Sequence, residues 1–281
     1  AGSFDDMLIG TERDSYNSLS GNGVVYVLRG GSGLAASQSM PTDADVTIWG
    51  AASGDRAGVE VAAAGDVDGD GSEDVLIGAY YESTNDTNAG AAYLLYGPLN
   101  TDGDVTTGTT FLGTEDSGYA GYSLSAAGDV DDDGYDDILI GAYGSDEAYL
   151  ILGESSVLSD ADLDSGDVDT VFTGVSEDRF GVSLSKAGDL SGDGIDDVLI
   201  GADRANGTDG EVYAFFSPIS SGTIAATSAD VTIVGENLSR GGTSLTGGED
   251  YDGDGITDIL IGSYKADANN GAAYLILGTW E

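Results

Sequence analysis

Short apolar runs separated by turns rich in Gly and Asp recur along the whole chain. The most hydrophobic runs read VLIGA, ILIGA, VLIGA and ILIGS, and they begin at Val75, Ile138, Val198 and Ile259. Runs of this length bounded by Gly and Asp are typical of β-strands, and helical periodicity is absent from the sequence. Because consecutive positions in these runs are apolar, we expect neighbouring sheets to cover both faces of each strand.

Each apolar run belongs to a unit of four predicted strands that recurs about every 60 residues. The first predicted strand precedes an acidic turn, the second is the apolar run, and the third carries a Tyr. The fourth is short and ends in Gly, as in VTIWG from Val46 and TVFTG from Thr170. Four antiparallel strands per unit, repeated at this interval, are typical of β-propeller blades. We therefore predict an all-β fold, with a single β-propeller domain over residues 1–281.

The repeats place five blades along the chain. The expected boundaries are 4–50, 51–113, 114–174, 175–235 and 236–281. The first blade is partial because it lacks its first strand, and the last blade ends after its third strand. One interpretation is a five-blade portion of a larger ring, completed upstream or by another chain that supplies the missing strands. The other is a closed five-bladed ring with one degenerate blade.

An acidic segment of nine residues joins the first and second predicted strands in four of the units. It reads DVDGDGSED from Asp66, DVDDDGYDD from Asp129, DLSGDGIDD from Asp189 and DYDGDGITD from Asp250. Side-chain oxygens occupy positions one, three, five and nine, and alternate residues of a tight loop can point toward one centre. The Gly at position six permits a sharp turn, as in the first half of an EF-hand calcium loop.

These four segments predict four Ca²⁺ sites, with position seven contributing its backbone carbonyl. The candidate ligands are Asp66, Asp68, Asp70, Ser72 and Asp74; Asp129, Asp131, Asp133, Tyr135 and Asp137; Asp189, Ser191, Asp193, Ile195 and Asp197; and Asp250, Asp252, Asp254, Ile256 and Asp258. Asp-Gly sequences are also good hairpin turns, but carboxylates repeated in one phase repel one another unless a cation lies among them. Because Ser191 replaces an Asp, we expect the third site to be the weakest.

Charge and composition narrow the classes of function. The net charge is −43, from 51 acidic and 8 basic residues, so nucleic acid and anionic membranes are unsuitable partners. The chain has no His and no Cys, which excludes imidazole and thiol catalysis, and disulfides. No apolar run is long enough to span a membrane, so we expect no membrane insertion. Calcium loops of this type suit a calcium-rich medium, so we expect an extracellular or cell-surface location.

The units resemble FG-GAP repeats, which form the blades of the integrin α-subunit propeller and occur in many bacterial surface proteins. The pairs at the "FG" position are Ala57-Gly58, Ala120-Gly121, Phe180-Gly181 and Gly241-Gly242. The triplets at the "GAP" position are Gly78-Ala79-Tyr80, Gly141-Ala142-Tyr143, Gly201-Ala202-Asp203 and Gly262-Ser263-Tyr264. The resemblance covers essentially the whole chain, although only one Phe and no Pro is kept. It implies that the five visible repeats belong to a seven-bladed ring that acts in recognition or adhesion.

Six of the eight basic residues fall in two registers of the repeat. They precede the "FG" glycine by two residues or follow the LIG glycine by three, and Tyr occupies equivalent places. This candidate ligand face, opposite the metal loops, comprises Arg56, Tyr119, Arg179, Arg240, Arg13, Tyr81, Arg204 and Lys265. Each Arg could instead pair with an acid of its own or the next blade, for example Asp55 or Asp178 beside it. Otherwise the face receives an anionic, protein or carbohydrate partner.

The leading functional hypothesis is a calcium-binding, non-enzymatic extracellular propeller that acts as a recognition or adhesion module. One alternative is a structural subunit of a surface layer or filament. The other is a polysaccharide-active enzyme domain, in which clustered carboxylates would act as acid and base. The enzyme alternative is disfavoured because the ordered carboxylates are already assigned to metal.

Overall fold

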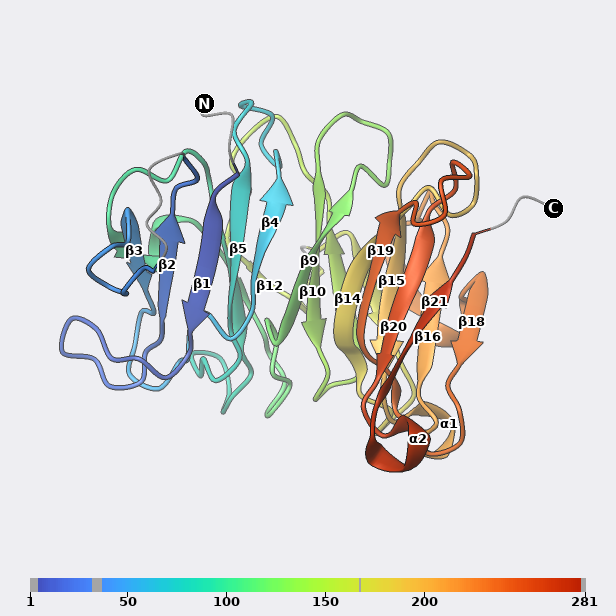
Figure 1. Cartoon of the computed structure of the whole chain (residues 1–281). Coiled ribbons are helices and arrows are strands. Elements are labelled where there is room, and N and C mark those ends of the chain that lie inside the picture. The colour runs from blue at the N-terminus through green and yellow to red at the C-terminus, as the bar shows by residue number, and fades with distance from the viewer. Residues whose placement is uncertain (1–4, 32–36, 167, 279–281) are drawn as a thin grey trace.

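The computed structural model describes residues 5–31, 37–166 and 168–278 of the 281-residue chain, and it confirms the predicted all-β fold class (Figure 1). The described part contains five β-sheets arranged side by side. Its helical segments are short: α1 (Ala205–Thr208), α2 (Ala266–Asn269), and two 3-10 turns, η1 (Val105–Thr107) and η2 (Ala226–Ser228). None of the described helices is long and apolar enough to cross a membrane.

The second, third and fourth sheets each contain the four antiparallel strands of a propeller blade. The second sheet consists of β4 (Val61–Gly65), β5 (Asp74–Ala79), β6 (Ala91–Leu95) and β8 (Thr109–Leu112). The third consists of β9 (Ser123–Gly128), β10 (Asp137–Ala142), β11 (Glu147–Ile151) and β13 (Thr170–Thr173). The fourth consists of β14 (Phe180–Gly188), β15 (Asp197–Ala202), β16 (Glu211–Phe215) and β18 (Val231–Val234).

The first and last sheets contain fewer antiparallel strands, in the order predicted from the sequence. The first is built from β1 (Met7–Thr11), β2 (Val24–Leu28) and β3 (Val46–Trp49). The last is built from β19 (Gly241–Glu249), β20 (Asp258–Ser263) and β21 (Ala272–Ile276). The described sheets do not close into a ring (Figure 1), so the closed five-bladed alternative is not adopted.

Three short strands come from one blade and join the sheet of the blade before it, and the sequence pattern did not predict them. They are β7 (Gly103–Asp104), β12 (Ala161–Asp162) and β17 (Gly222–Ala225). Each lies between the third and fourth strands of its own blade and pairs in parallel with the outer strand of the preceding one. Segments of two to four residues are too short to show a period, so only their place in the fold reveals them.

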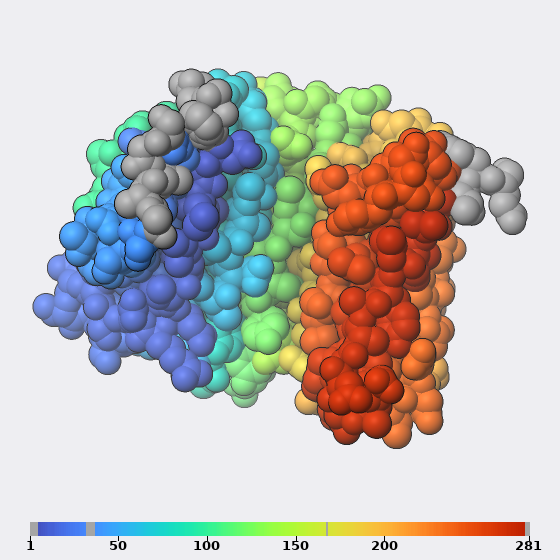
Figure 2. All heavy atoms as spheres, viewed as in Figure 1, coloured from blue at the N-terminus to red at the C-terminus, as the bar shows by residue number. Residues whose placement is uncertain are grey.

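The core lies between successive sheets, where the apolar second strands are covered on both faces as predicted. All residues of β5, β10 and β15 are buried. Gly78 shows why these strands carry a Gly: a Cβ there would lie 1.9 Å from the carbonyl oxygen of Gly121 in the next sheet. The sheets therefore meet backbone to backbone near β9. In the view of Figure 2, which is the same as that of Figure 1, the surface is hollowed over the green third sheet.

Candidate metal loops and the opposite face

All four acidic loops lie at one edge of the sheets. They connect β4 to β5, β9 to β10, β14 to β15 and β19 to β20. The helical turns α1 and α2, which connect second to third strands, lie at the opposite edge (Figure 1). The fold therefore presents two distinct faces, one with the acidic loops and one with the candidate ligand face.

Position one has the same geometry in all four loops. Its carboxylate accepts a hydrogen bond from the N–H of the Gly at position six. The donor–acceptor distances are 3.0 Å for Gly71 to Asp66, 2.9 Å for Gly134 to Asp129, 2.9 Å for Gly194 to Asp189 and 2.8 Å for Gly255 to Asp250. These glycines have positive φ, between 88° and 95°, which a residue with a Cβ rarely adopts. The loop is thus folded back on its first carboxylate.

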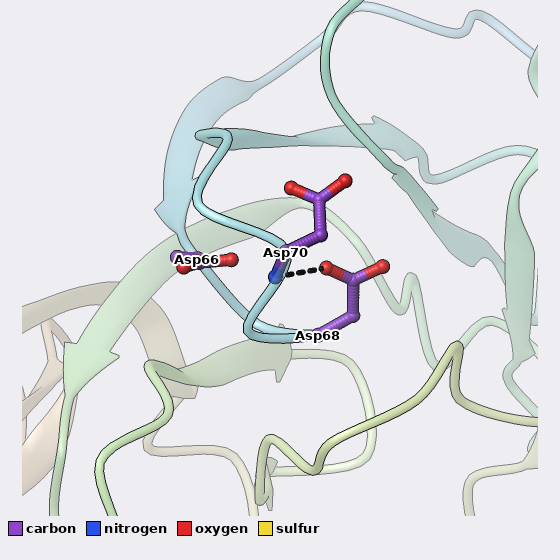
Figure 3. A group of neighbouring side chains, drawn as sticks. All are labelled: Asp66, Asp68 and Asp70. Atoms are coloured by element: carbon purple, nitrogen blue, oxygen red, sulfur yellow. Dashed lines mark hydrogen bonds between the residues drawn. The ribbon is translucent and has the colours of Figure 1, made fainter.

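Three loops bring three carboxylate oxygens within 4.8 Å of one another: Asp66, Asp68 and Asp70; Asp129, Asp131 and Asp137; and Asp250, Asp252 and Asp254. In the first loop the Asp70 N–H donates to Asp68 Oδ1 at 3.1 Å, which holds these two side chains next to each other (Figure 3). Three predicted ligands are therefore close together in each of these loops, and among the described residues no Lys or Arg forms an ion pair with them.

The third loop differs, as its sequence suggested. Among the described residues, no group of three acidic side chains in the Asp189 loop meets the same 4.8 Å distance. Ser191 replaces the Asp at position three, and its buried Oγ has no hydrogen-bond partner in the described part of the chain. Its backbone N–H donates to Asp197 Oδ2 at 2.8 Å.

Position seven marks the end of each turn. The N–H of this residue donates to the carboxylate at position five, at 2.7 Å in Ser72, 3.0 Å in Tyr135, 3.0 Å in Ile195 and 2.9 Å in Ile256. The acceptors are Asp70, Asp133, Asp193 and Asp254. These local hydrogen bonds orient the side chain at position five in all four loops.

The Asp at position nine has a second role that the sequence pattern did not reveal. Asp74, Asp137, Asp197 and Asp258 are fully buried. Each accepts an N–H from position two of its own loop and another from the second residue after the third strand. For Asp74 the donors are Val67 at 3.0 Å and Gly97 at 2.8 Å. Burial raises the pKa of Asp74 to about 6 and of Asp137 to about 7, although the backbone hydrogen bonds favour the ionised form.

The donor set fits a hard divalent cation. The predicted ligands offer only oxygen atoms, which Ca²⁺ prefers, and no nitrogen or sulfur. Asp66 Oδ1 is buried and, within the described residues, accepts no hydrogen bond. An ionised oxygen buried in this way is costly unless a cation or donor compensates it. The acidic clusters of the first, second and fourth loops could therefore bind a metal ion through side-chain oxygens.

On the opposite face, three arginines and one Tyr occupy equivalent turns. Arg56, Tyr119, Arg179 and Arg240 all have φ between 56° and 59°. Asp55, one of the acids suggested as a partner for Arg56, instead accepts the Ala52 N–H at 2.7 Å. Arg56 donates to the Tyr80 hydroxyl at 2.9 Å and lies 3.9 Å from Glu12 Oε2.

Two of these arginines share one buried acid. Arg179 Nη1 lies 3.3 Å from Asp203 Oδ1, and Arg240 Nη1 lies 3.1 Å from Asp203 Oδ2. Asp203 has no exposed surface. It occupies the position that carries Tyr in the other repeats, and the sequence pattern did not single it out as a partner. One sequence signal could have found it: Asp203 is the acidic residue among the third residues of the four "GAP" triplets.

Five tyrosine rings form a continuous row on this face. The rings of Tyr80 and Tyr81 lie 4.3 Å apart, those of Tyr119 and Tyr143 lie 5.3 Å apart, and Tyr122 packs edge-on against Tyr143 at 4.5 Å. Arg guanidinium groups stack at both ends of this tyrosine row. Arg56 lies 4.4 Å from the Tyr81 ring and Arg179 lies 4.3 Å from the Tyr143 ring.

The remaining residues of the candidate ligand face are more exposed. Arg13 Nε pairs with Glu12 Oε1 at 3.2 Å. Lys265 Nζ lies 5.7 Å from the Tyr264 ring, and Arg204 is exposed. Of the four arginines that form ion pairs in the described part of the chain, Arg179 and Arg240 are the most buried, and both are held by Asp203.

A sequence model of the FG-GAP repeat matches residues 57–95, 120–158, 180–215 and 241–276. Each match begins at a pair that the sequence pattern placed at the "FG" position, and it contains one acidic loop and the strand that follows. Together these matches cover more than half of the chain.

Integrin α-subunits are similar to the chain over much of its length. Integrin alpha-5 of Xenopus laevis is 32% identical over 174 residues, which are 56% of this chain and 16% of that protein. Integrin alpha pat-2 of Caenorhabditis elegans is 32% identical over 224 residues, 73% of this chain and 18% of the relative. Integrin alpha-PS2 of Drosophila melanogaster is 32% identical over 225 residues, which are 72% of this chain and 15% of that protein. The chain spans less than a fifth of these relatives, and its repeats show that it belongs to the FG-GAP repeat family.

Proposed function

We propose that this chain is a calcium-stabilised β-propeller module that recognises a partner in adhesion, outside the cell or at its surface. The observation that carries the proposal is the fourfold recurrence of one loop geometry, in which a Gly at position six bonds the carboxylate at position one. Integrin α-subunits are the named relatives, and this favours adhesion and a protein partner over an enzymatic role.

The loop residues would hold Ca²⁺, and the bound ion would supply the positive charge that a chain of net charge −43 lacks. Carboxylates at positions one, three and five would bind directly. The position-nine Asp would join the cation to the second strand, because its two oxygens are also bonded to backbone N–H groups from two segments. Filling a loop would therefore stiffen both the turn and the sheet behind it.

The face opposite the acidic loops is the proposed recognition face. Arg179 and Arg240 are engaged with Asp203, so their main role there is to hold neighbouring turns together. The tyrosine row is half-buried, and its rings offer apolar surface with polar hydroxyl groups, which is typical of protein-binding surfaces. We propose a protein partner; a carbohydrate that stacks on the rings is the alternative occupant.

Thermal unfolding tests the calcium part of the proposal. At a free Ca²⁺ concentration of about 100 times Kd, each independent filled site should add about 2.7 kcal/mol to the free energy of unfolding. We expect the melting temperature to fall sharply in a chelator and to return when Ca²⁺ is added back. The same melting temperature in Ca²⁺ and in chelator would show that the loops are ordinary turns.

Binding to arrays of matrix proteins and glycans in Ca²⁺ tests the recognition part. Tyr81→Ala and Tyr119→Ala should abolish binding without changing the melting temperature greatly. The matched control is Tyr251→Ala, because Tyr251 is 53% exposed but lies in the fourth acidic loop, on the other face. Equal loss in all three variants, or assembly of the protein into polymers without binding to either array, would contradict the recognition role.

A further inference from the structure

The acidic loops are linked to one another across the sheets. The N–H of Asp66, at position one of the first loop, donates to Asp136 Oδ2 of the second loop at 2.8 Å. The N–H of Asp136 donates back to the Asp66 carbonyl at 3.3 Å. Asp136 stands at position eight, which is not among the predicted metal ligands. A residue outside the predicted ligand set therefore fixes the backbone of a predicted ligand in the neighbouring loop.

Close packing accompanies this link. Gly65 precedes the first loop, and a Cβ there would lie 2.3 Å from Asp136 Oδ2. Within the loop, a Cβ at Gly69 would lie 2.3 Å from Cε1 of Tyr135. Real side chains do not approach so closely, so both glycines leave room for the second loop. The two loops are therefore in direct contact.

A related contact joins the second and third loops. The carboxyl group of Asp196, which is position eight of the third loop, lies against the backbone of Asp129. A Cβ at Gly128 would lie 1.9 Å from Asp196 Oδ2. In the fourth loop, position eight is Thr257, and its methyl group rather than a carboxylate faces Gly188. The acidic link thus joins the first, second and third loops only.

We infer that Asp136 and Asp196 are positioning residues that couple cation binding in one loop to cation binding in the loop before it. This inference rests on the proposed calcium function. A cation in the second loop orders residues 129–137 and with them the Asp136 carboxylate. That carboxylate then holds the N–H of Asp66, so the first loop loses less conformational freedom when it binds its own cation. Because coupling is reciprocal, filling the first loop also favours the second.

Calorimetric titration with Ca²⁺ in a protein that retains only the first two sites tests this coupling. Asp193→Ala and Asp254→Ala remove a predicted ligand from the third and fourth loops. In that background we expect the Ca²⁺ affinity of the first loop to be at least about fivefold higher with an intact second loop than after Asp131→Ala, which removes a predicted ligand from the second loop. Asp136→Ala should reduce first-loop affinity by a similar factor, and Asp136→Asn, which keeps an acceptor oxygen, should restore most of it.

Glu73→Ala is the matched control, because Glu73 is exposed, stands at position eight of the first loop and is also a carboxylate next to a candidate ligand. It should leave the coupling unchanged, which separates the link from a simple loss of negative charge. First-loop affinity that is independent of Asp131→Ala, or an equal effect of Glu73→Ala and Asp136→Ala, would overturn the inference. Absence of any Ca²⁺ binding by the unmodified chain would instead refute the proposed function.

Amide hydrogen exchange provides a second readout in the full four-site chain. In Ca²⁺, Asp131→Ala should speed exchange of the Asp66 N–H, whereas Asp254→Ala should not, because the fourth loop has no acidic link to the first. This comparison needs no variant at Asp136, so it remains decisive if Asp136→Ala fails to fold. Unchanged exchange at Asp66 in Asp131→Ala would contradict the coupling.

Discussion

Arg240 reaches from the turn before the last sheet to Asp203, which directly follows β15 of the fourth sheet, with 3.1 Å between Nη1 and Oδ2. Asp203 also pairs with Arg179, so one buried carboxylate is shared by two guanidinium groups from successive turns. The contact joins elements on either side of a blade boundary. Its position predicts a structural role for these arginines.

We expect Asp203→Asn to lower the free energy of unfolding by about 3 kcal/mol, because it leaves two largely buried guanidinium groups without their shared counter-charge. Urea unfolding in Ca²⁺ measures the change. The control is Glu177→Gln, which removes an exposed carboxylate close to Arg179 in the same turn. Equal stability of the two variants would show that the Asp203 contact contributes little.

Ser191→Asp should convert the third loop into the pattern of the other three. An added carboxylate at position three should tighten Ca²⁺ binding at that loop by roughly tenfold, since ligand charge tunes affinity in such loops. In a chelator the same change should lower the melting temperature, because it adds negative charge to an uncompensated cluster. Calorimetric titration measures the tighter Ca²⁺ binding, and thermal melting in a chelator measures the lower stability. A higher melting temperature of Ser191→Asp in the chelator would contradict the assignment of position three.

Glu147 should make stability depend on pH. The Tyr149 hydroxyl lies 2.7 Å from Glu147 Oε2 and 2.9 Å from Asp164 Oδ1, yet it has one proton to donate. Burial raises the pKa of Glu147, the charge of Asp164 raises it further, and the Tyr149 hydrogen bond opposes them. The carboxyl group is therefore better accommodated when it is protonated.

With the folded pKa above the ordinary value, the stability from protonated Glu147 is complete below that value and is lost as pH rises through the folded pKa. We expect the unfolding free energy of the native chain, relative to Glu147→Gln, to fall as pH rises above about 4.3. Urea unfolding of both proteins across this range, in saturating Ca²⁺, measures the difference. The control is Glu154→Gln, at an exposed acid. A difference that does not change with pH would refute this prediction.

Gly78→Ala should separate neighbouring sheets. The new Cβ would lie 1.9 Å from the Gly121 carbonyl oxygen, which is backbone and cannot rotate away. We expect a cost of about 3 kcal/mol in the free energy of unfolding. Gly31→Ala is the control, because a Cβ there has no neighbour within 4 Å among the described residues and φ is not positive. A loss of stability in Gly78→Ala no greater than in the control would mean that the sheets can move apart at little cost.

Much of the candidate site could be read from the sequence because its signals are local. Positions one, three and five of a loop lie within five residues of one another, and in the first and fourth loops the structure brings the carboxylates at these positions together. The second role of Asp74 was not readable, because its partner Gly97 belongs to the end of the third strand. The pairing of Arg240 with Asp203 was missed for the same reason, since 37 residues separate them.

The amino-acid sequence by itself determined that this protein is built from repeated short strands with an acidic turn in each complete repeat. Apolar runs need burial and clustered carboxylates need cations, and both requirements are visible within a few residues. Only the tertiary structure decided which repeats touch and through which atoms. Asp136 lies beside Asp66, and β12 pairs with β8, because sheets stacked side by side bring together residues that the chain separates by an entire repeat.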